Sequence, residues 1–267
     1  MKTLPVSATF LLSLMAFSVR AHDVWVTSHS EQREVVAVIG YGHHFPDRGT
    51  LPGRKHYFSL PRLTDGKQII TLQPTREAYI YRAENIPVPE SYIITASMKP
   101  TFWSRTSAGW RAADKKQRPD VTYCEFATKY ARTITGTGGP ADMAVIAQPT
   151  GQELEIIPVT NPLKASEHPA KFRIMYKNVP LENAEVEINS AEYVSQHHHD
   201  HRSHRNTVEH HEHASQMILK SDATGIITVN QLPAGEWLLL TKQKSAYSDI
   251  SRCDETMTAA TLSFTRR

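Results

Sequence analysis

Short runs of β-forming residues recur along most of the chain, with Pro, Gly or Asn between them. Strands at this spacing, separated by turn residues, are typical of antiparallel β-sandwiches, so we expect an all-β fold. Only the stretch 120–133 reads as a possible helix, because its aromatic and small residues fall on one helical face. The runs that predict strands are 34–39, 68–72, 78–81, 92–96, 143–147, 155–158, 170–175, 184–188, 226–229, 236–242 and 261–265.

The length of 267 residues suits two modest β domains behind a short leader. We place the join within residues 150–158, ahead of a stretch that contains Asn and Pro. This predicts an N-terminal β domain over 22–150 and a C-terminal β-sandwich over 151–267. A His-rich stretch, 197–213, falls between two strands of the second sandwich, where a long polar insertion does not disturb a core.

Residues 1–21 have the pattern of a secretory signal peptide. Lys2 supplies a positive start, residues 10–17 are apolar, and a small-residue cleavage site ends at Ala21. The alternative is a membrane anchor, but the apolar stretch is shorter than the ~20 residues that a span needs. No other stretch is long and apolar enough to span a bilayer. We therefore expect an exported, periplasmic protein that does not itself span the membrane.

The net charge argues against a nucleic-acid partner. The whole chain carries +3, and removing residues 1–21 takes away Lys2 and Arg20 but no acidic residue, which leaves +1. A nucleic-acid-binding domain has a basic stripe instead. Because histidines gain positive charge below about pH 6.5, the balance depends on pH.

Cys124 and Cys253 are the two cysteines of the chain. In an oxidising compartment a disulfide between them is the default expectation. In the chain-entropy model such a bond, closing a loop of this length, is worth about 4–5 kcal/mol. The alternative is a pair of thiolate metal ligands, which oxidation makes less favourable.

Eight of the fourteen histidines fall within the seventeen residues 197–213. Imidazole suits zinc, copper and nickel, and His-rich tracts are typical of metal binding. The stretch has no apolar periodicity and is interrupted by acidic residues, unlike a core element or a purification tag. We expect a metal-gathering loop; a solvated loop with incidental histidines is the alternative. The candidate ligands are His197, His198, His199, His201, His204, His210, His211 and His213.

Cleavage after Ala21 makes His22 the first residue of the mature chain. An N-terminal histidine offers two ligands, its α-amine and Nδ1, which close a six-membered chelate ring. The amine has a reference pKa of about 7.7–8.0, so a metal can displace its proton at neutral pH. This is the first half of a histidine brace, as in copper-dependent oxygenases and some copper carriers. Cleavage one residue away would remove the chelate.

A histidine pair follows a β-like run. His43 and His44 lie between Gly42 and Pro46, and adjacent residues of a strand point to opposite faces. Both can reach one metal only if the backbone turns there, which the glycine and the proline favour. We expect one of the pair to join His22, with His44 slightly favoured. An ordinary pair of loop histidines is the alternative.

Several short motifs together resemble one family of periplasmic proteins. They are Ala21-His22-Asp23-x-Trp25, Gly42-His43-His44-Phe45-Pro46, Gly151-x-x-Leu154-Glu155-Ile156-x-Pro158-x-x-Asn161-Pro162, Asp222-x-x-Gly225, Pro233-x-Gly235-x-Trp237 and Cys253-Asp254-Glu255. The family is described as the periplasmic component of cobalt/nickel transport systems and is formally one of unknown function. The resemblance covers essentially the whole mature chain. It implies that the second sandwich is immunoglobulin- or transthyretin-like and that metal binds at His22 and the 42–46 segment.

The leading hypothesis is a periplasmic divalent-metal-binding protein in nickel or cobalt uptake, which passes metal to components of a membrane transporter. The tract would concentrate metal through weak sites, while His22 and His44 would form a sharper site. Nitrogen ligands alone do not select nickel, since affinity rises from cobalt through nickel to copper and falls again at zinc. A zinc or copper buffer or carrier is therefore the nearest alternative.

Two other classes of function are less favoured. A copper-brace oxidoreductase needs an axial residue such as Tyr41 or Tyr57, and nothing in the sequence indicates that either approaches the metal. No Ser-His-Asp, nucleotide-binding glycine loop or H-E-x-x-H pattern is present, so we expect no enzyme activity. A structural or adhesion sandwich with a pH-sensitive histidine surface would bind metal no better than about millimolar.

Overall fold

The computed structural model describes residues 22–49, 55–136, 141–198 and 215–267. Within these ranges most of the chain forms β-strands, which confirms the expected all-β fold. None of the helices in the described ranges is long and apolar enough to cross a membrane. The short helical segments there are η1 (Lys55–Tyr57, 3₁₀), α1 (Met143–Ile146) and α2 (Ala191–His198).

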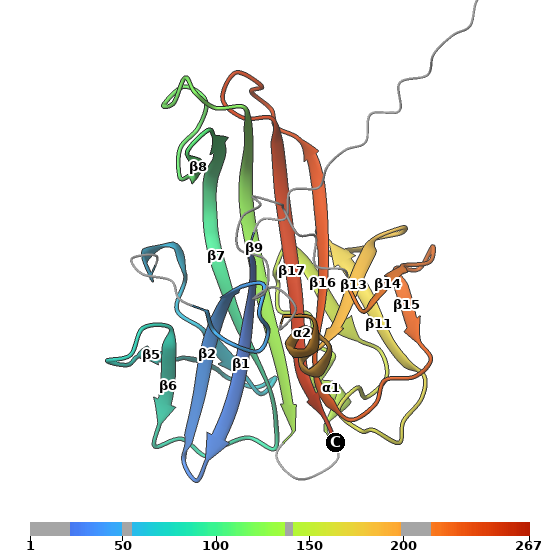
Figure 1. The fold of residues 1–267 in the computed structure, drawn as a ribbon. Coiled ribbons are helices and arrows are strands. Elements are labelled where there is room, and N and C mark those ends of the chain that lie inside the picture. The colour runs from blue at the N-terminus through green and yellow to red at the C-terminus, as the bar shows by residue number, and fades with distance from the viewer. Residues whose placement is uncertain (1–21, 50–54, 137–140, 199–214) are drawn as a thin grey trace, which may run out of the picture.

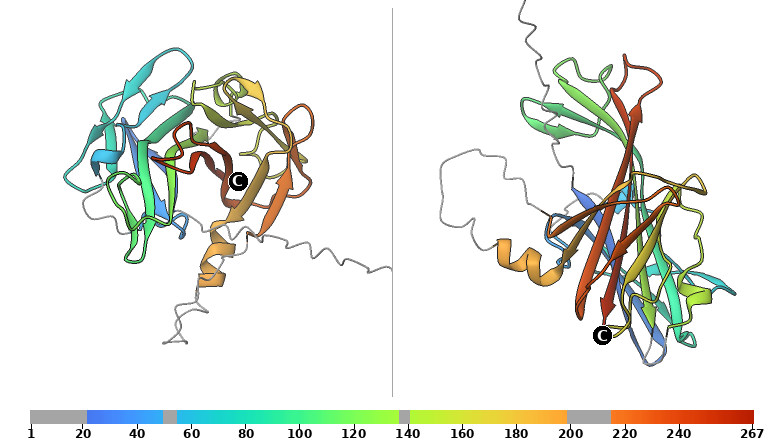
Figure 2. Two further views of the ribbon diagram at one scale, coloured as in Figure 1. Left: turned by 90° about the horizontal axis from the view of Figure 1, so that it is seen from above. Right: turned by 90° about the vertical axis from the view of Figure 1, so that its right-hand side faces the viewer.

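Two small sheets flank a large one. The first has the strand order β1–β2–β6–β5, and in the second β11 pairs with β10, β12 and β15. Seen from above, the two small sheets lie on either side of the long central strands (Figure 2). Their strands are β1 (Asp23–Glu31), β2 (Glu34–Gly42), β5 (Gln73–Pro74), β6 (Ile80–Glu84), β10 (Leu154–Pro158), β11 (Ala170–Tyr176), β12 (Val179–Pro180) and β15 (Ile226–Val229).

The large nine-stranded sheet joins the two halves of the chain. Its order is β14–β13–β16–β17–β9–β7–β3–β4, and β8 pairs with the end of β7. Because β17 pairs in parallel with β9, the two expected sandwiches share one continuous sheet (Figure 1). Its strands are β3 (Arg62–Thr64), β4 (Ile69–Thr71), β7 (Ser91–Thr106), β8 (Gly109–Arg111), β9 (Tyr123–Gly136), β13 (Glu185–Ser190), β14 (Met217–Lys220), β16 (Gly235–Ala246) and β17 (Glu255–Arg266).

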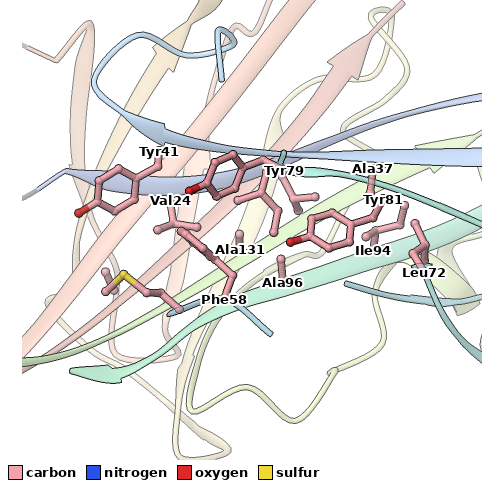
Figure 3. Packing of buried hydrophobic residues seen from close by; sticks show 14 of the residues in the cluster. Val24, Ala37, Tyr41, Phe58, Leu72, Tyr79, Tyr81, Ile94, Ala96 and Ala131 are labelled. Carbon is pink, nitrogen blue, oxygen red and sulfur yellow. The ribbon is translucent and has the colours of Figure 1, made fainter. Parts of the chain in front are cut away.

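Each face of the large sheet supports its own hydrophobic core. The first core lies under the β1–β2–β6–β5 sheet and includes Val24, Tyr41 and Ala131, which Figure 3 shows packed together with other buried residues. The second lies under the β10–β11 sheet and includes Ile134 and Phe172. Successive side chains of a strand point to opposite faces, so β9 contributes Ala131 to one core and Ile134 to the other. The central strands of the large sheet are thus covered on both sides where the two small sheets pack against them.

Most of the stretch 120–133 belongs to strand β9, which begins at Tyr123, so the helix expected there is wrong. Cys124, Ala127 and Ala131 are buried on this strand, and so are the charged residues Lys129 and Arg132. A strand covered on both faces loses the simple alternation of apolar and polar residues that identifies a half-buried strand. The remaining pattern of aromatic and small residues imitates one face of a helix.

The run 143–147 is also different from the expectation, because it contains helix α1 instead of a strand. The Asp142 side chain caps this helix by accepting a hydrogen bond from the backbone N–H of Ala144 at 2.8 Å. A capping aspartate supplies an acceptor to a first turn that has no internal partner, and so favours helix over strand. The other expected runs overlap strands of the structure.

The expected disulfide between Cys124 and Cys253 is present, with Cα atoms 4.8 Å apart. It links the start of β9 to the turn before β17. These two strands, with β7 and β16, extend beyond both sandwiches as a projecting end (Figure 1). The backbone N–H of Cys124 also donates to the Asp254 carboxylate at 2.9 Å. The bridge and this hydrogen bond together fasten the projecting end.

Candidate metal centre

The start of β1 lies beside the turn that follows β2. The two strands pair so that Asp23 is opposite Gly42, which brings His22 next to His43. The His22 ring stacks on Tyr41, with centroids 5.0 Å apart and planes at 7°. It also stacks on His43 at 4.8 Å and 27°. The two segments expected to bind metal therefore meet.

Two glycines shape the turn after β2. Gly42 has a φ of 145°, a conformation that residues with a Cβ rarely adopt. A Cβ on Gly40 would lie 2.0 Å from Nε1 of Trp25, so only glycine lets the indole cross at this point. Trp25 contacts Phe45 edge-on and donates from Nε1 to the Pro46 carbonyl at 3.4 Å. The turn expected at Gly42 and Pro46 is confirmed.

Lysines of the large sheet contact the first residues of β1. Lys129 on β9 is 2% exposed, and its ammonium group donates a hydrogen bond to the His22 carbonyl. Its Nζ also lies 5.8 Å from the centre of the Tyr41 ring. Lys242 on β16 forms an ion pair with Asp23 at 2.9 Å. The segment that would become the mature N-terminus is therefore fixed on the sheet.

A pocket of about 60 Å³ lies between the turn and helix α2. The turn contributes His43 and His44 to its lining, and α2 contributes His197. Two carboxylates, Asp23 and Glu187, also line it. The pocket thus combines imidazole and carboxylate groups from parts of the chain more than one hundred residues apart.

His197 is oriented as a ligand would be. Its Nδ1 lies 2.9 Å from the carbonyl oxygen of Tyr193. A carbonyl only accepts, so Nδ1 carries the proton and, in the neutral ring, Nε2 keeps the lone pair. Liganding histidines usually have their second nitrogen fixed in this way. The ring also packs against Tyr193, with centroids 3.9 Å apart.

Both ends of the His-rich tract are attached beside this pocket. Helix α2 ends at His198, and the described chain resumes at Ser215. The Ser215 hydroxyl donates to the Glu187 carboxylate at 2.6 Å, and the backbone N–H of Gln216 donates to the Asn189 side chain at 2.8 Å. Asn189 lines the pocket as well. The other candidate ligands of the tract lie outside the described residues: His199, His201, His204, His210, His211 and His213.

Among the described residues, no three His, Cys, Asp or Glu side chains already surround one ion position. The rings of His22 and His43 are stacked, whereas the lone pairs that bind a metal lie in the ring planes. In the full chain the His22 nitrogen is also part of the peptide bond to Ala21, so its amine exists only after cleavage. A site would be completed by cleavage and a rotation of the rings.

The other candidates have different environments. His29, His56 and His168 are exposed, and none of them lines the pocket. The alternative of two thiolate ligands is wrong, because Cys124 and Cys253 are joined in the disulfide.

The charged groups of the large sheet around Lys129 have no local signature in the sequence. Glu125 is 3% exposed; burial raises its pKa, against the opposite effects of Lys129, Lys244 and Lys242. Its Oε1 has no hydrogen-bond partner within the described part of the chain. From the sequence alone, lysines are expected to face solvent. Lys129 and Lys242 instead contact residues at the start of β1, because β9 and β16 lie on either side of β17.

The remaining motifs stabilise the fold. Glu155 forms a buried ion pair with Arg132 at 3.2 Å. Trp237 donates from Nε1 to the Pro233 carbonyl at 3.0 Å, and the Asp222 carboxylate accepts hydrogen bonds from the backbone of its own turn. These interactions give the residues of these motifs a structural role. The two motifs that contain histidine are the ones that border the pocket.

No curated protein matches the chain. Solved structures similar to it include native alpha-2-macroglobulin of Escherichia coli spanning domains MG0-NIE-MG1, at 8% identity over 87% of this chain and 94% of that one. Another is a Salmonella alpha-2-macroglobulin reacted with methylamine, at 11% identity over 92% of this chain and 15% of that one. Both TM-scores are 0.21, too low to bear on fold or function. A family model described as a domain of unknown function (DUF4198) matches residues 19–245, and the chain belongs to that family.

Proposed function

We propose that this chain is an exported divalent-metal-binding protein that captures nickel or cobalt and passes it to a membrane transporter. The observation that carries the proposal is the meeting of three histidine-bearing segments. His22 stacks on His43, and His43, His44 and His197 line or border one small pocket. Nitrogen donors with nearby carboxylates suit divalent ions of the later transition series.

The tract would act as the collecting part of the protein. Its two ends are attached at Glu187 and at α2, beside the pocket. Weak ligands tethered next to a tighter site raise the metal concentration there without any new contact. His197, with Nε2 available for a metal, would be the first point of transfer from the tract to the pocket.

The choice of nickel or cobalt rests on the family resemblance and not on the ligands. The same donors would bind copper more tightly and zinc comparably, so a zinc or copper carrier is the nearest alternative. An oxygen-activating copper enzyme is less favoured. Tyr41 places its ring face against His22, and Tyr57 packs against Trp103 at 5.5 Å, so neither hydroxyl is directed at His22 by these contacts.

Export is supported by the leader-like residues 1–21 and by the Cys124–Cys253 disulfide, since disulfides persist in oxidising compartments. Removal of this leader after Ala21 would create the amine of His22. The proposed site would therefore form only in the exported protein.

The test is a calorimetric titration of nickel, cobalt, zinc and copper into mature protein that begins at His22. Three variants accompany it: His22→Ala, a chain with 199–214 replaced by a Gly-Ser linker, and His29→Ala as the matched control for an exposed histidine on the same strand. We expect a sub-micromolar site that survives the linker replacement, is lost in His22→Ala and is unchanged in His29→Ala. Loss of all binding with the linker would instead make the protein a buffer without a defined centre.

A further inference from the structure

Side chains of the large sheet, and not a neighbouring backbone, hold one edge of strand β1. Alternate carbonyls of a strand point to the same side, so those of residues 22, 24 and 26 face a common edge. Each accepts a hydrogen bond from a different side chain. Lys129 donates to the carbonyl of His22, Thr261 donates to that of Val24 at 2.7 Å, and Ser263 donates to that of Val26.

Removing Lys129 from water costs more free energy than removing the hydroxyl groups of the other two donors. An ammonium group removed from water is far more costly than a hydroxyl, and it is tolerated only where charges and hydrogen bonds compensate. Threonine and serine are sufficient to fasten β1 at the next two positions. Burying the ammonium group of Lys129 at 2% exposure costs more free energy than holding the strand requires, which points to an additional role for this residue.

Lys242 on β16 contacts Asp23, the residue that follows His22. Residues opposite one another on neighbouring strands point to the same face, and Ala259 on β17 is opposite both Lys242 and Lys129. The small side chain of Ala259 leaves space between the two lysines. One ammonium holds the His22 carbonyl there, and the other pairs with the Asp23 carboxylate.

We propose that Lys129 and Lys242 are positioning residues that hold the mature N-terminus against the His43 turn. Lys129 fixes the backbone of His22 and also lies near the Tyr41 ring on which the His22 ring stacks. Neither lysine is a metal ligand. This role rests on the proposed function, in which the amine and the ring of His22 chelate a metal. By holding the backbone of His22, the two lysines keep that residue in one place.

The first arm of the test needs no metal. Hydrogen–deuterium exchange of the backbone amides of residues 23–26 is compared in mature wild-type protein, Lys129→Met, Lys242→Met and Lys244→Met. Lys244 is the matched control, because it lies on the same strand as Lys242 but pairs with Glu255. We expect exchange at least tenfold faster in the first two variants and unchanged in the control. Unchanged exchange in both Lys129→Met and Lys242→Met would overturn the proposal.

The second arm uses copper(II) alone as a spectroscopic probe. We expect Lys129→Met to bind at least tenfold more weakly and its paramagnetic resonance spectrum to shift toward that of His22→Ala. A wild-type affinity and spectrum in folded Lys129→Met would overturn the positioning role. Lys242→Met, at a side chain that is 22% exposed, serves as the second variant where substitution of the more deeply buried Lys129 prevents folding. A wild-type protein without a His22-dependent site would refute the proposed function, while the exchange result still decides whether the lysines hold the terminus.

Discussion

Lys129 donates a hydrogen bond from its buried ammonium group to the carbonyl oxygen of His22, joining the shared sheet to the residue on which the metal proposal depends. Lys129 belongs to β9, a strand that contributes to both hydrophobic cores. The backbone of His22 is thus held by a strand that lies between the two cores. A site built in this way has less conformational freedom than one on a loop, and such pre-organisation favours binding.

The first prediction concerns the amine of His22. Acetylation of the His22 amine in the mature protein converts it to an amide nitrogen with no free amine beside it, so the chelate with Nδ1 is lost. We expect at least a tenfold loss of affinity at the tight site, or roughly 1.4 kcal/mol. Calorimetric titration of nickel into the two forms measures it. Equal affinities would show that the chelate does not contribute.

The second prediction separates the two histidines of the turn. Sequence reasoning favoured His44, but the ring next to His22 belongs to His43, at 4.8 Å between centroids. We expect His43→Ala to weaken nickel binding by about tenfold, or ~1.4 kcal/mol, and His44→Ala to weaken it less. The measurement is the same titration, with His56→Ala as a control on an exposed histidine. The reverse order would assign the ligand to His44.

Local signals in the sequence were sufficient for much of this structure. The turn at Gly42 and Pro46 follows from backbone preferences of those residues alone. The pairing of Cys124 with Cys253 follows from there being only two cysteines. Strand positions follow from short runs of β-forming residues between turn residues, even where the strand is buried throughout, as in β10.

The shared sheet could not be predicted because it depends on a contact between distant segments. The parallel pairing of β17 with β9 joins residues about 130 positions apart, as Glu255 with Glu125 illustrates. No local pattern marks this pairing, and burial on both faces removed the alternation that identifies a strand. For the same reason Lys129 and Lys242 were not recognised as part of the site. Their direction is known only once β9, β17 and β16 are adjacent.

The third prediction concerns the buried ion pair of the second core. Burial lowers the pKa of Arg132 to about 10, while the Glu155 carboxylate acts in the opposite direction. Glu155→Gln leaves a buried guanidinium without its counter-charge, so we expect the free energy of unfolding to fall by roughly 3–5 kcal/mol. Urea denaturation followed by circular dichroism measures this.

A double variant provides the control for that result. Arg132→Met with Glu155→Gln removes the uncompensated charge and keeps a carbonyl acceptor for the backbone N–H groups of Thr150 and Gln152. We expect it to be more stable than Glu155→Gln alone. If it is equally unstable, the loss does not come from the uncompensated charge, but from packing or from the carbonyls of Ile146 and Gln148, which lose their hydrogen-bond donor in Arg132→Met.

The fourth prediction concerns acid stability at the turn before β15. Hydrogen bonds from the backbone N–H of Ile226 and from Thr224 lower the pKa of Asp222 below its ordinary value of 3.8. The unfolded chain therefore binds this proton more readily, and stability falls as pH decreases through that window. Asp222→Ala removes the carboxylate, so the urea midpoint of this variant should lie below that of wild type. The difference between the two midpoints should be largest above about pH 5 and should shrink below about pH 3.8.

Asp222→Asn is the matched variant, because its amide oxygen can still accept from Thr224 and Ile226 but carries no charge. We expect its difference from Asp222→Ala to stay constant between pH 7 and pH 3, while the difference between wild type and Asp222→Ala narrows. Urea midpoints measured at four pH values distinguish the constant difference from the one that narrows. If the difference in urea midpoint between wild type and Asp222→Ala does not change with pH, the turn is stabilised by the hydrogen-bond acceptor alone, with no contribution from the charge of Asp222.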